Sequence, residues 1–107
     1  MWQKITPKLG RRNMNTPRVN CNDKRAHLYL PKEYTGEHDR ASIYYDGGTR
    51  IAFAFSDDGE YTVTNSSENA MRRVMIPAEL RDKVRKGIYD VTVKNEAGAY
   101  VLDTATL

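Results

Sequence analysis

The sequence predicts a mainly β domain with one or two short helices, folded as a small barrel from two degenerate half-repeats. Two observations point to this fold class. From residue 19 onward, short runs rich in β-branched and aromatic residues alternate with turn residues. A short apolar strand that ends in proline also occurs twice, at Pro31 and Pro77, and each proline is followed two positions later by a glutamate.

Length and composition limit the chain to one small domain. It has 107 residues, of which 39% are hydrophobic and 29% charged. A chain of this size buries only about two-thirds of its unfolded surface, so we expect a device that adds burial, such as dimerisation or strand exchange. The single cysteine, Cys21, excludes an internal disulfide and a thiolate zinc site within one chain, and it fits a reducing compartment.

No segment has the roughly 18 consecutive apolar residues of a membrane span, and the N-terminus has no apolar run typical of a signal peptide. We therefore expect a soluble, cytoplasmic protein without membrane contact. Residues 1–16 contain Pro7, Gly10 and scattered charges without apolar periodicity, which predicts a flexible basic arm before a single β-rich domain, 17–107.

The first half of the domain reads as a strand followed by a hairpin. Residues 26–30 form a short strand that stops at Pro31, because proline cannot donate a ladder hydrogen bond. Residues 42–45 and 50–55 are expected to pair, since the intervening Asp46-Gly47-Gly48-Thr49 is a strong hairpin turn. A second turn at 56–59 leads into a strand over 60–64.

The second half follows the same order after a polar connector at 65–69. Residues 72–76 read as a strand, and Pro77 begins a helix predicted to run to residue 86 and to be capped by Gly87. A strand over 88–93, a turn at 94–98 and a strand over 99–102 complete the chain. The predicted half-repeats are 17–64 and 65–107.

One string in the second half resembles a known superfamily. The residues Arg73-Val74-Met75-Ile76-Pro77-Ala78-Glu79-Leu80-Arg81 are similar to the half-repeat of the AbrB/MazE/MraZ swapped-hairpin proteins, which reads approximately G-R-x-x-I-P-x-E-L-R. Lys24 and Arg72 stand where that pattern has glycine, and Tyr34-Thr35-Gly36 stands where the first half should have its Leu-Arg helix. With both halves counted, the resemblance covers 18–103, and the tandem arrangement looks most like MraZ.

The resemblance implies a swapped-hairpin barrel in which one chain supplies both copies, as a monomeric pseudo-dimer or within a homo-oligomer. It also implies binding of double-stranded DNA in transcription regulation, in a phage or a bacterium, through basic residues beside the strands that precede each proline. Carried over by position, those DNA-binding residues are Arg18, Lys24, Arg25, Arg72, Arg73 and Arg81.

The charge distribution suits a polyanionic partner in one part of the chain only. Residues 1–25 hold seven basic residues against one acidic residue, and four of them, Lys4, Lys8, Arg11 and Arg12, lie in the arm, where they could add phosphate contacts. Residues 26–64 instead hold seven acidic residues against three basic ones. The alternative function is therefore a small protein-binding regulator or inhibitor of a host protein, encoded by a phage or mobile element. The arginines would then form only a solvated face.

No catalytic arrangement stands out, so we expect no enzyme activity, no cofactor and no metal. His27 lies within a strand, and His38 lies in a charged loop, without the spacing of a metal-binding pair. The strand aromatics, among them Tyr29, are expected to pack in the core rather than to stack on bases.

Overall fold

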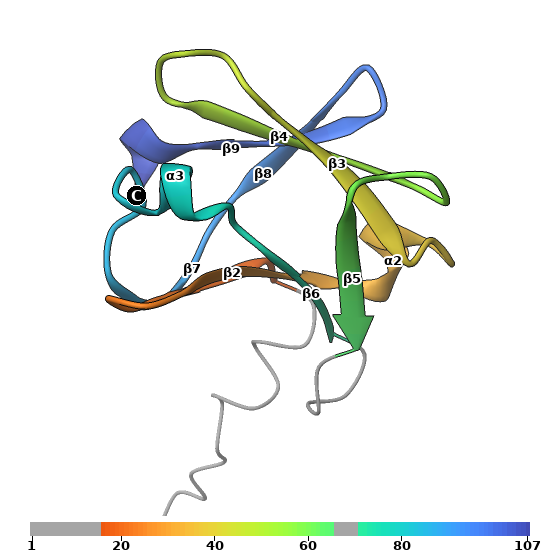
Figure 1. Ribbon diagram of the computed structural model, residues 1–107, viewed down its shortest axis with the longest axis horizontal. Helices are drawn as coiled ribbons and strands as arrows, with labels where there is room; N and C mark the ends of the chain where they lie inside the picture. Colours follow the sequence, from red (N-terminus) through yellow and green to blue (C-terminus); the bar gives the residue numbers. More distant parts are fainter. Residues whose placement is uncertain (1–15, 66–70) are drawn as a thin grey trace, which may run out of the picture.

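The computed structural model of the chain describes residues 16–65 and 71–107. Its architecture is mainly β with two short helices, which confirms the expected fold class (Figure 1). The first half contains β1 (Arg18–Cys21), β2 (Ala26–Pro31), α2 (Lys32–Thr35), β3 (Arg40–Tyr45) and β4 (Arg50–Ser56). The second contains β5 (Tyr61–Asn65), β6 (Met71–Met75), α3 (Ala78–Arg81), β7 (Gly87–Asp90), β8 (Val93–Glu96), β9 (Ala99–Asp103) and η1 (Thr104–Thr106).

The strands form one antiparallel sheet that curls into a barrel-like shape. Its order is β7-β1-β2-β6-β5-β3-β4-β9-β8. The strands β7 and β8 at the two ends of this order follow each other directly in the chain, separated only by Val91 and Thr92. In Figure 1, β2 and β6 cross below β4 and β9, so the sheet encloses a core between these two layers. The expectation of a single strand over 88–93 was wrong, because the segment changes its pairing partner from β1 to β9 between its two parts.

The strand pairing has an internal two-fold symmetry. In the centre of one layer, β2 pairs with β6 so that Leu28 lies opposite Val74. In the other layer, β4 pairs with β9, and the pair Ile51–Leu102 is matched by the pair Phe53–Tyr100. The second half of the chain repeats the neighbours of the first: β5 takes the place of β1, β6 of β2, the β7–β8 segment of β3, and β9 of β4. When the β7–β8 segment is counted once, as the element that joins the two ends of the order, these exchanges leave the order of the sheet unchanged. The repeated unit in this pairing is therefore strand, strand, helix, strand, strand.

This pairing shifts two details of the expected repeat. The strand equivalent to β1 is β5, which begins at Tyr61, so the second unit starts before the expected boundary at 64/65. The two basic doublets are also not equivalent, because the spacing between Pro31 and Pro77 makes Ala26 the counterpart of Arg72. Ala26 is fully buried, and Arg72 consequently points into the molecule.

Both helices are single turns that begin after a proline. Pro31 (φ −55°, ψ 149°) and Pro77 (φ −54°, ψ 144°) have nearly the same extended backbone, and a four-residue helix follows each of them. The expected helix over 77–86 was too long. After Arg81 the chain continues in tight turns, and Gly87 (φ 124°) begins β7 instead of capping a helix. Pairing of Gly87 with Cys21 fixes this path.

Alternation along the strands defines the core. Inward positions carry fully buried apolar side chains, among them Leu28, Phe53 and Leu102. Leu80 of α3 and Val84, one helical turn later, are also buried and close the side of the core next to β1. Among the described residues, no helix is long and apolar enough to cross a membrane. The basic arm residues Lys4, Lys8, Arg11 and Arg12 lie outside the described residues.

Candidate nucleic-acid interface

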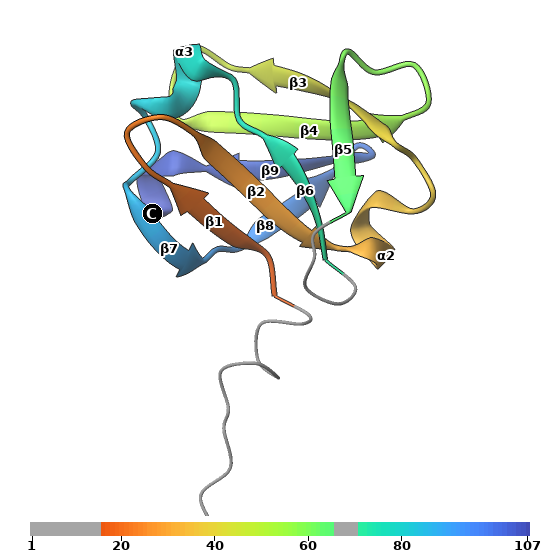
Figure 2. The same ribbon diagram turned by 60° about the horizontal axis from the view of Figure 1, so that its bottom comes forward.

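The outer side of β1, β2 and β6 carries the basic residues that the sequence singled out. Because successive side chains on a strand alternate between faces, burial of Val19, Leu28 and Val74 turns their neighbours outward. Figure 2 shows β1, β2 and β6 side by side on the side that faces the reader. We call this surface the basic face and define it by Arg18, Arg25, His27, Tyr29 and Arg73.

Tyr29 is at the centre of the basic face, between two arginines. Arg18 on β1 and Arg73 on β6 are its partners in the two neighbouring strands. The guanidinium carbon of Arg18 lies 5.1 Å from the centre of the Tyr29 ring, within cation–π distance. Arg73 is exposed, and its Nε donates to Thr64 Oγ1 at 3.2 Å, so the guanidinium is oriented at the surface. A polyanion would meet two oriented cations with an aromatic ring between them.

His27 adds a titratable group next to these cations. Burial and, secondarily, the nearby charges of Arg73 and Arg25 lower the pKa of His27 below the usual 6.5. Its neighbours in the adjacent strands, Asn20 and Met75, are uncharged. The imidazole is therefore mostly neutral near pH 7, and a nearby phosphate would favour its protonated form.

A second group of cations lies where the β1–β2 turn meets the loop after α3. We call it the basic end, and it comprises residues 22–25 and 81–86. Arg81 Nη1 donates to the carbonyl of Lys24, and Lys86 pairs with Asp23, so the two segments are held together. The basic end contains two acidic residues, Asp23 and Asp82, and six basic ones, Lys24, Arg25, Arg81, Lys83, Arg85 and Lys86.

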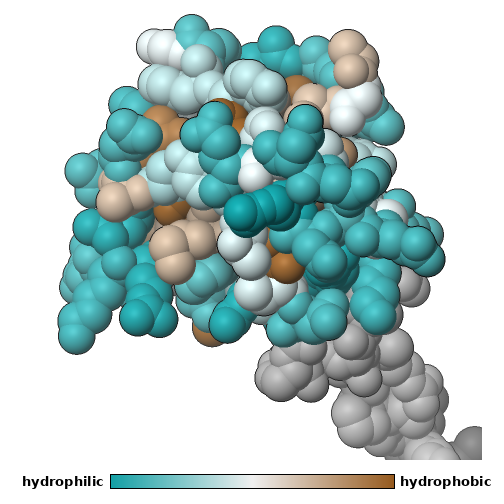
Figure 3. Space-filling view, turned by 45° about the vertical axis from the view of Figure 1, so that its right-hand side comes forward, coloured by the Kyte–Doolittle hydropathy of each residue, from teal (hydrophilic) through white to brown (hydrophobic). Residues whose placement is uncertain are grey.

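The opposite side of the barrel has the reverse charge. The loop after α2 contains Glu37 and Asp39, and the 56–60 turn beside it contains Asp57, Asp58 and Glu60. His38 Nδ1 lies 2.9 Å from Asp57 Oδ1, which links the two segments. We call these residues the acidic end. α2 and α3 lie on opposite sides of the molecule in Figure 1, and Figure 3 shows the side toward α2 and β5 covered mainly by hydrophilic residues.

Arg72 does not belong to the interface that the sequence predicted. Its side chain is only 6% exposed, and it donates to the carbonyl of His38 and to Asp39 Oδ1, both at 2.6 Å. It also lies 3.4 Å from the carbonyl of Val63. The guanidinium thus connects β6 with β5 and with the loop before β3. The reason is its position: Arg72 faces inward, whereas Arg73 faces outward.

The other expected site residues remain at the surface but form two groups. Arg18, Arg25 and Arg73 lie on the basic face, while Lys24 and Arg81 lie at the basic end, which Arg25 joins to the face. Sequence reasoning missed Lys83, Arg85 and Lys86, although four cations within 81–86 are visible in the sequence. It also placed Tyr29 in the core, whereas the alternation of buried Ala26, Leu28 and Leu30 could have shown that Tyr29 points outward.

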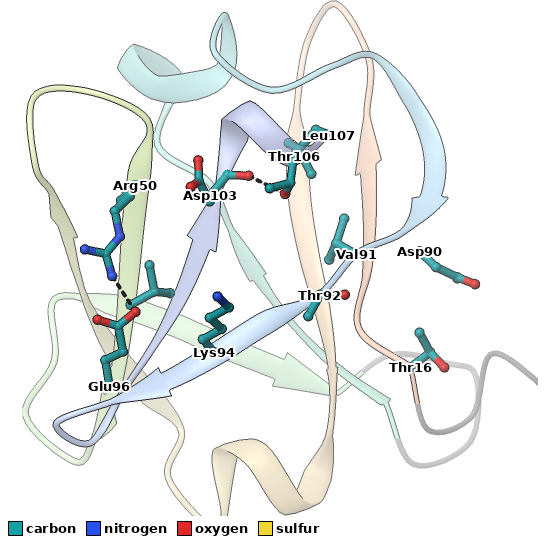
Figure 4. A pocket seen from close by; sticks show the side chains of 11 residues that line it. Thr16, Arg50, Asp90, Val91, Thr92, Lys94, Glu96, Asp103, Thr106 and Leu107 are labelled. Carbon is teal, nitrogen blue, oxygen red and sulfur yellow. Dashed lines mark hydrogen bonds and ion pairs between the residues drawn. The ribbon is translucent and has the colours of Figure 1, made fainter.

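A separate groove of about 530 Å³ lies beside β8, β9 and η1 (Figure 4). Its lining mixes the cations Arg50 and Lys94 with the acids Asp90, Glu96 and Asp103, and Arg50 pairs with Glu96 across it. Such a lining gives no dominant charge for a ligand of either sign. Among the described residues, no group of three or more histidine, cysteine or acidic side chains could hold a metal ion.

Comparison with known proteins adds no relative: no protein-family model, no curated protein and no solved structure matches the chain.

Proposed function

We propose that the chain binds double-stranded DNA, in a regulatory role without catalysis, through the basic face and the basic end. The observation that carries the proposal is the concentration of cations on one side of a barrel whose other side is acidic. A polyanion can approach only one of these sides without repulsion. Phosphate contacts from these residues would supply most of the affinity, and Arg73, exposed and oriented by Thr64, is the best placed to reach a base edge.

The basic arm would extend the same contacts. Lys4, Lys8, Arg11 and Arg12 precede β1, and β1 carries Arg18 on the basic face. Short basic arms commonly track the phosphate backbone or enter a minor groove next to a docked domain. The proposal therefore treats arm, basic face and basic end as one surface for DNA.

The acidic end favours the second candidate, a regulator that binds a host protein. Five acidic residues gather there, and a duplex would avoid them. This candidate requires that a basic partner protein binds at the acidic end. It also requires that the basic end contributes nothing to the affinity for that partner. The two candidates therefore make opposite predictions for charge changes at the two ends.

The test compares two double variants with the same change in net charge. Lys24→Gln with Arg25→Gln removes two cations from the basic end, and Lys32→Gln with Arg40→Gln removes two exposed cations near the acidic end. Affinity for a duplex of random sequence is measured between about 50 and 200 mM salt. We expect the first variant to lower the slope of log K against log salt by about 2, at roughly 0.9 per neutralised phosphate, and the second to leave it unchanged.

Two results would contradict the proposal. Wild-type protein without salt-sensitive affinity for duplex DNA would exclude DNA binding and leave the protein-binding candidate. An equal decrease in both variants would mean that only net charge matters and that the basic end is no interface.

A further inference from the structure

The outer surface of the second layer is apolar where a solvent-facing sheet should be polar. Antiparallel strands with one face in water normally alternate apolar and polar side chains. In β4, Ile51 and Phe53 are fully buried, yet the outward positions between and after them are Ala52 and Ala54. The whole stretch from Ile51 to Phe55 is apolar, a pattern that is typical of strands covered on both faces.

The neighbouring strands continue this apolar surface except at Ser42 of β3, which lies opposite Ala54. Across β9, Val101 lies opposite Ala52, and across β3, Tyr44 lies on the other side of Ala52. Tyr44 is 61% exposed, one of the large apolar side chains most open to solvent among the described residues. We call this surface the alanine face and define it by Tyr44, Ala52, Ala54, Ala99 and Val101. Apart from Tyr44 its members are partly exposed, and Val101 also lines the groove in which Arg50 pairs with Glu96.

Charged residues around the alanine face form a self-complementary pattern. The register places Arg50 of β4 opposite Asp103 of β9 at one end of the face, and the Arg50 guanidinium also pairs with Glu96 of β8 in the same chain. It also forms a row across four strands that runs Tyr44, Ala52, Val101 and Lys94. Hydrogen bonds from the backbone of Ala105 and from Thr49 lower the pKa of Asp103, so its carboxylate stays charged at neutral pH.

We propose that the alanine face is the interface for a second copy of this chain. When two such sheets pack face to face with aligned strands and a two-fold axis parallel to them, β4 lies over β9 of the other copy. Arg50 then lies over Asp103 of the partner subunit, and this contact occurs twice. Lys94 lies over the ring of Tyr44 of the partner subunit, also twice, and the small side chains meet in the centre.

The small size of the central residues fits this arrangement. Packed sheets lie about 10 Å apart, and alanines on both sides allow an approach at least this close. At that separation, an arginine and an aspartate that face each other across the interface are long enough to meet. The contact uses neither the basic face nor the basic end, so it does not depend on the proposed function.

The decisive experiment uses two variants that repel themselves and attract each other. In a dimer of the Arg50→Asp variant, the new aspartate at position 50 faces Asp103 of the partner subunit, and the two acidic side chains repel each other. In a dimer of the Asp103→Arg variant, the new arginine at position 103 faces Arg50 of the partner subunit, and the two basic side chains repel each other. A mixture of the two variants places opposite charges at both contacts. Because mixing cannot restore any contact within one chain, recovery of association reports only contacts between chains.

Association is measured by sedimentation velocity over a concentration series, with circular dichroism to verify the fold of each variant. We expect wild-type protein to form dimers, each single variant to dissociate with a Kd at least tenfold higher, and the equimolar mixture to recover most of the wild-type affinity. Wild-type protein that stays monomeric at every concentration would overturn the proposal, as would a mixture that associates no better than its components.

A second pair of variants keeps the test valid if either charge reversal prevents folding. Ala52→Lys places a charge in the centre of the alanine face and should abolish association. Thr62→Lys places the same charge at an exposed position of β5, away from the alanine face, and should leave association unchanged. Association that survives Ala52→Lys would overturn the proposal.

Discussion

Two adjacent arginines illustrate how much a one-residue shift along a strand decides. Arg72 is buried among carbonyl and carboxylate acceptors, whereas Arg73 lies exposed on the basic face. Both were expected at the DNA surface because the family resemblance carried both positions over as DNA-binding residues. The period of two along β6 turns them to opposite sides, so that Arg72 stabilises the fold and Arg73 is free for the proposed contact with DNA.

Alanine substitution should separate these roles. Arg72→Ala removes a buried guanidinium and leaves the acceptors of His38 and Asp39 without their donor, so we expect a decrease of about 2–4 kcal/mol in unfolding free energy. Arg73→Ala should change stability by less than about 0.5 kcal/mol and lower the salt slope of duplex binding by about 0.9. Urea unfolding and duplex titration measure the two effects; equal stabilities of the two variants would contradict the assignment.

His27 should make DNA binding depend on pH. Its pKa is below 6.5 in the free protein, and phosphate near the ring stabilises the imidazolium, so binding takes up a proton. Affinity should therefore rise as the pH falls toward the lowered pKa of His27 in the free protein, by up to about tenfold per unit, the limit for one linked proton, and level off below that pKa. His27→Gln should remove this rise, while His38→Gln at the acidic end should keep it. A pH profile that is unchanged in His27→Gln would refute the role of this residue.

At the scale of elements, the prolines and turn glycines were informative because their constraints are local. Pro31 and Pro77 end a strand and begin a helical turn in both halves, as their fixed φ and missing N–H dictate. The length of the second helix and the break between β7 and β8 were not predictable. They depend on the pairing of β7 with β1 and of β8 with β9, which residues far away in the sequence supply.

Gly59 in the turn between β4 and β5 tests such a tertiary constraint. A Cβ atom at this position would lie 2.4 Å from the backbone carbon of Ala41, and backbone cannot yield as a flexible side chain can. Gly59→Ala should therefore cost roughly 1–3 kcal/mol of stability by overpacking. Gly48→Ala is the matched control, because its nearest neighbour is the Asp46 side chain at 3.4 Å. Thermal unfolding compares the two, and a Gly59→Ala protein as stable as the control would contradict the close packing.

For the whole molecule, the pairing symmetry and the charge distribution do not coincide. The backbone repeats one unit twice, but the loop after α3 is basic and the equivalent loop after α2 is acidic. A duplex bound at the basic end therefore has no second, symmetry-related site on the same chain. Two copies joined through the alanine face would provide the second site.

The contribution of the basic arm to duplex binding should depend on the basic face next to which the arm begins. Changing Lys4, Lys8, Arg11 and Arg12 to glutamine in the full chain should lower the salt slope of duplex binding by about 0.9 for each phosphate that the arm neutralises. Stability should stay the same, which urea unfolding would verify as the control. An unchanged slope would show that the arm does not contact DNA.

The sequence by itself determined the fold class, most of the strands and turns, the start of the helical turn after Pro77 and the concentration of charge near the N-terminus. These follow from local constraints: proline and glycine backbone limits, period-two alternation and composition. The tertiary structure alone decided that Arg72 is buried against His38 and Asp39, that Tyr29 and His27 lie beside Arg73, and that residues 22–25 and 81–86 form one basic end. Each of these depends on contacts between segments far apart in the sequence, which the pattern along one segment does not reveal.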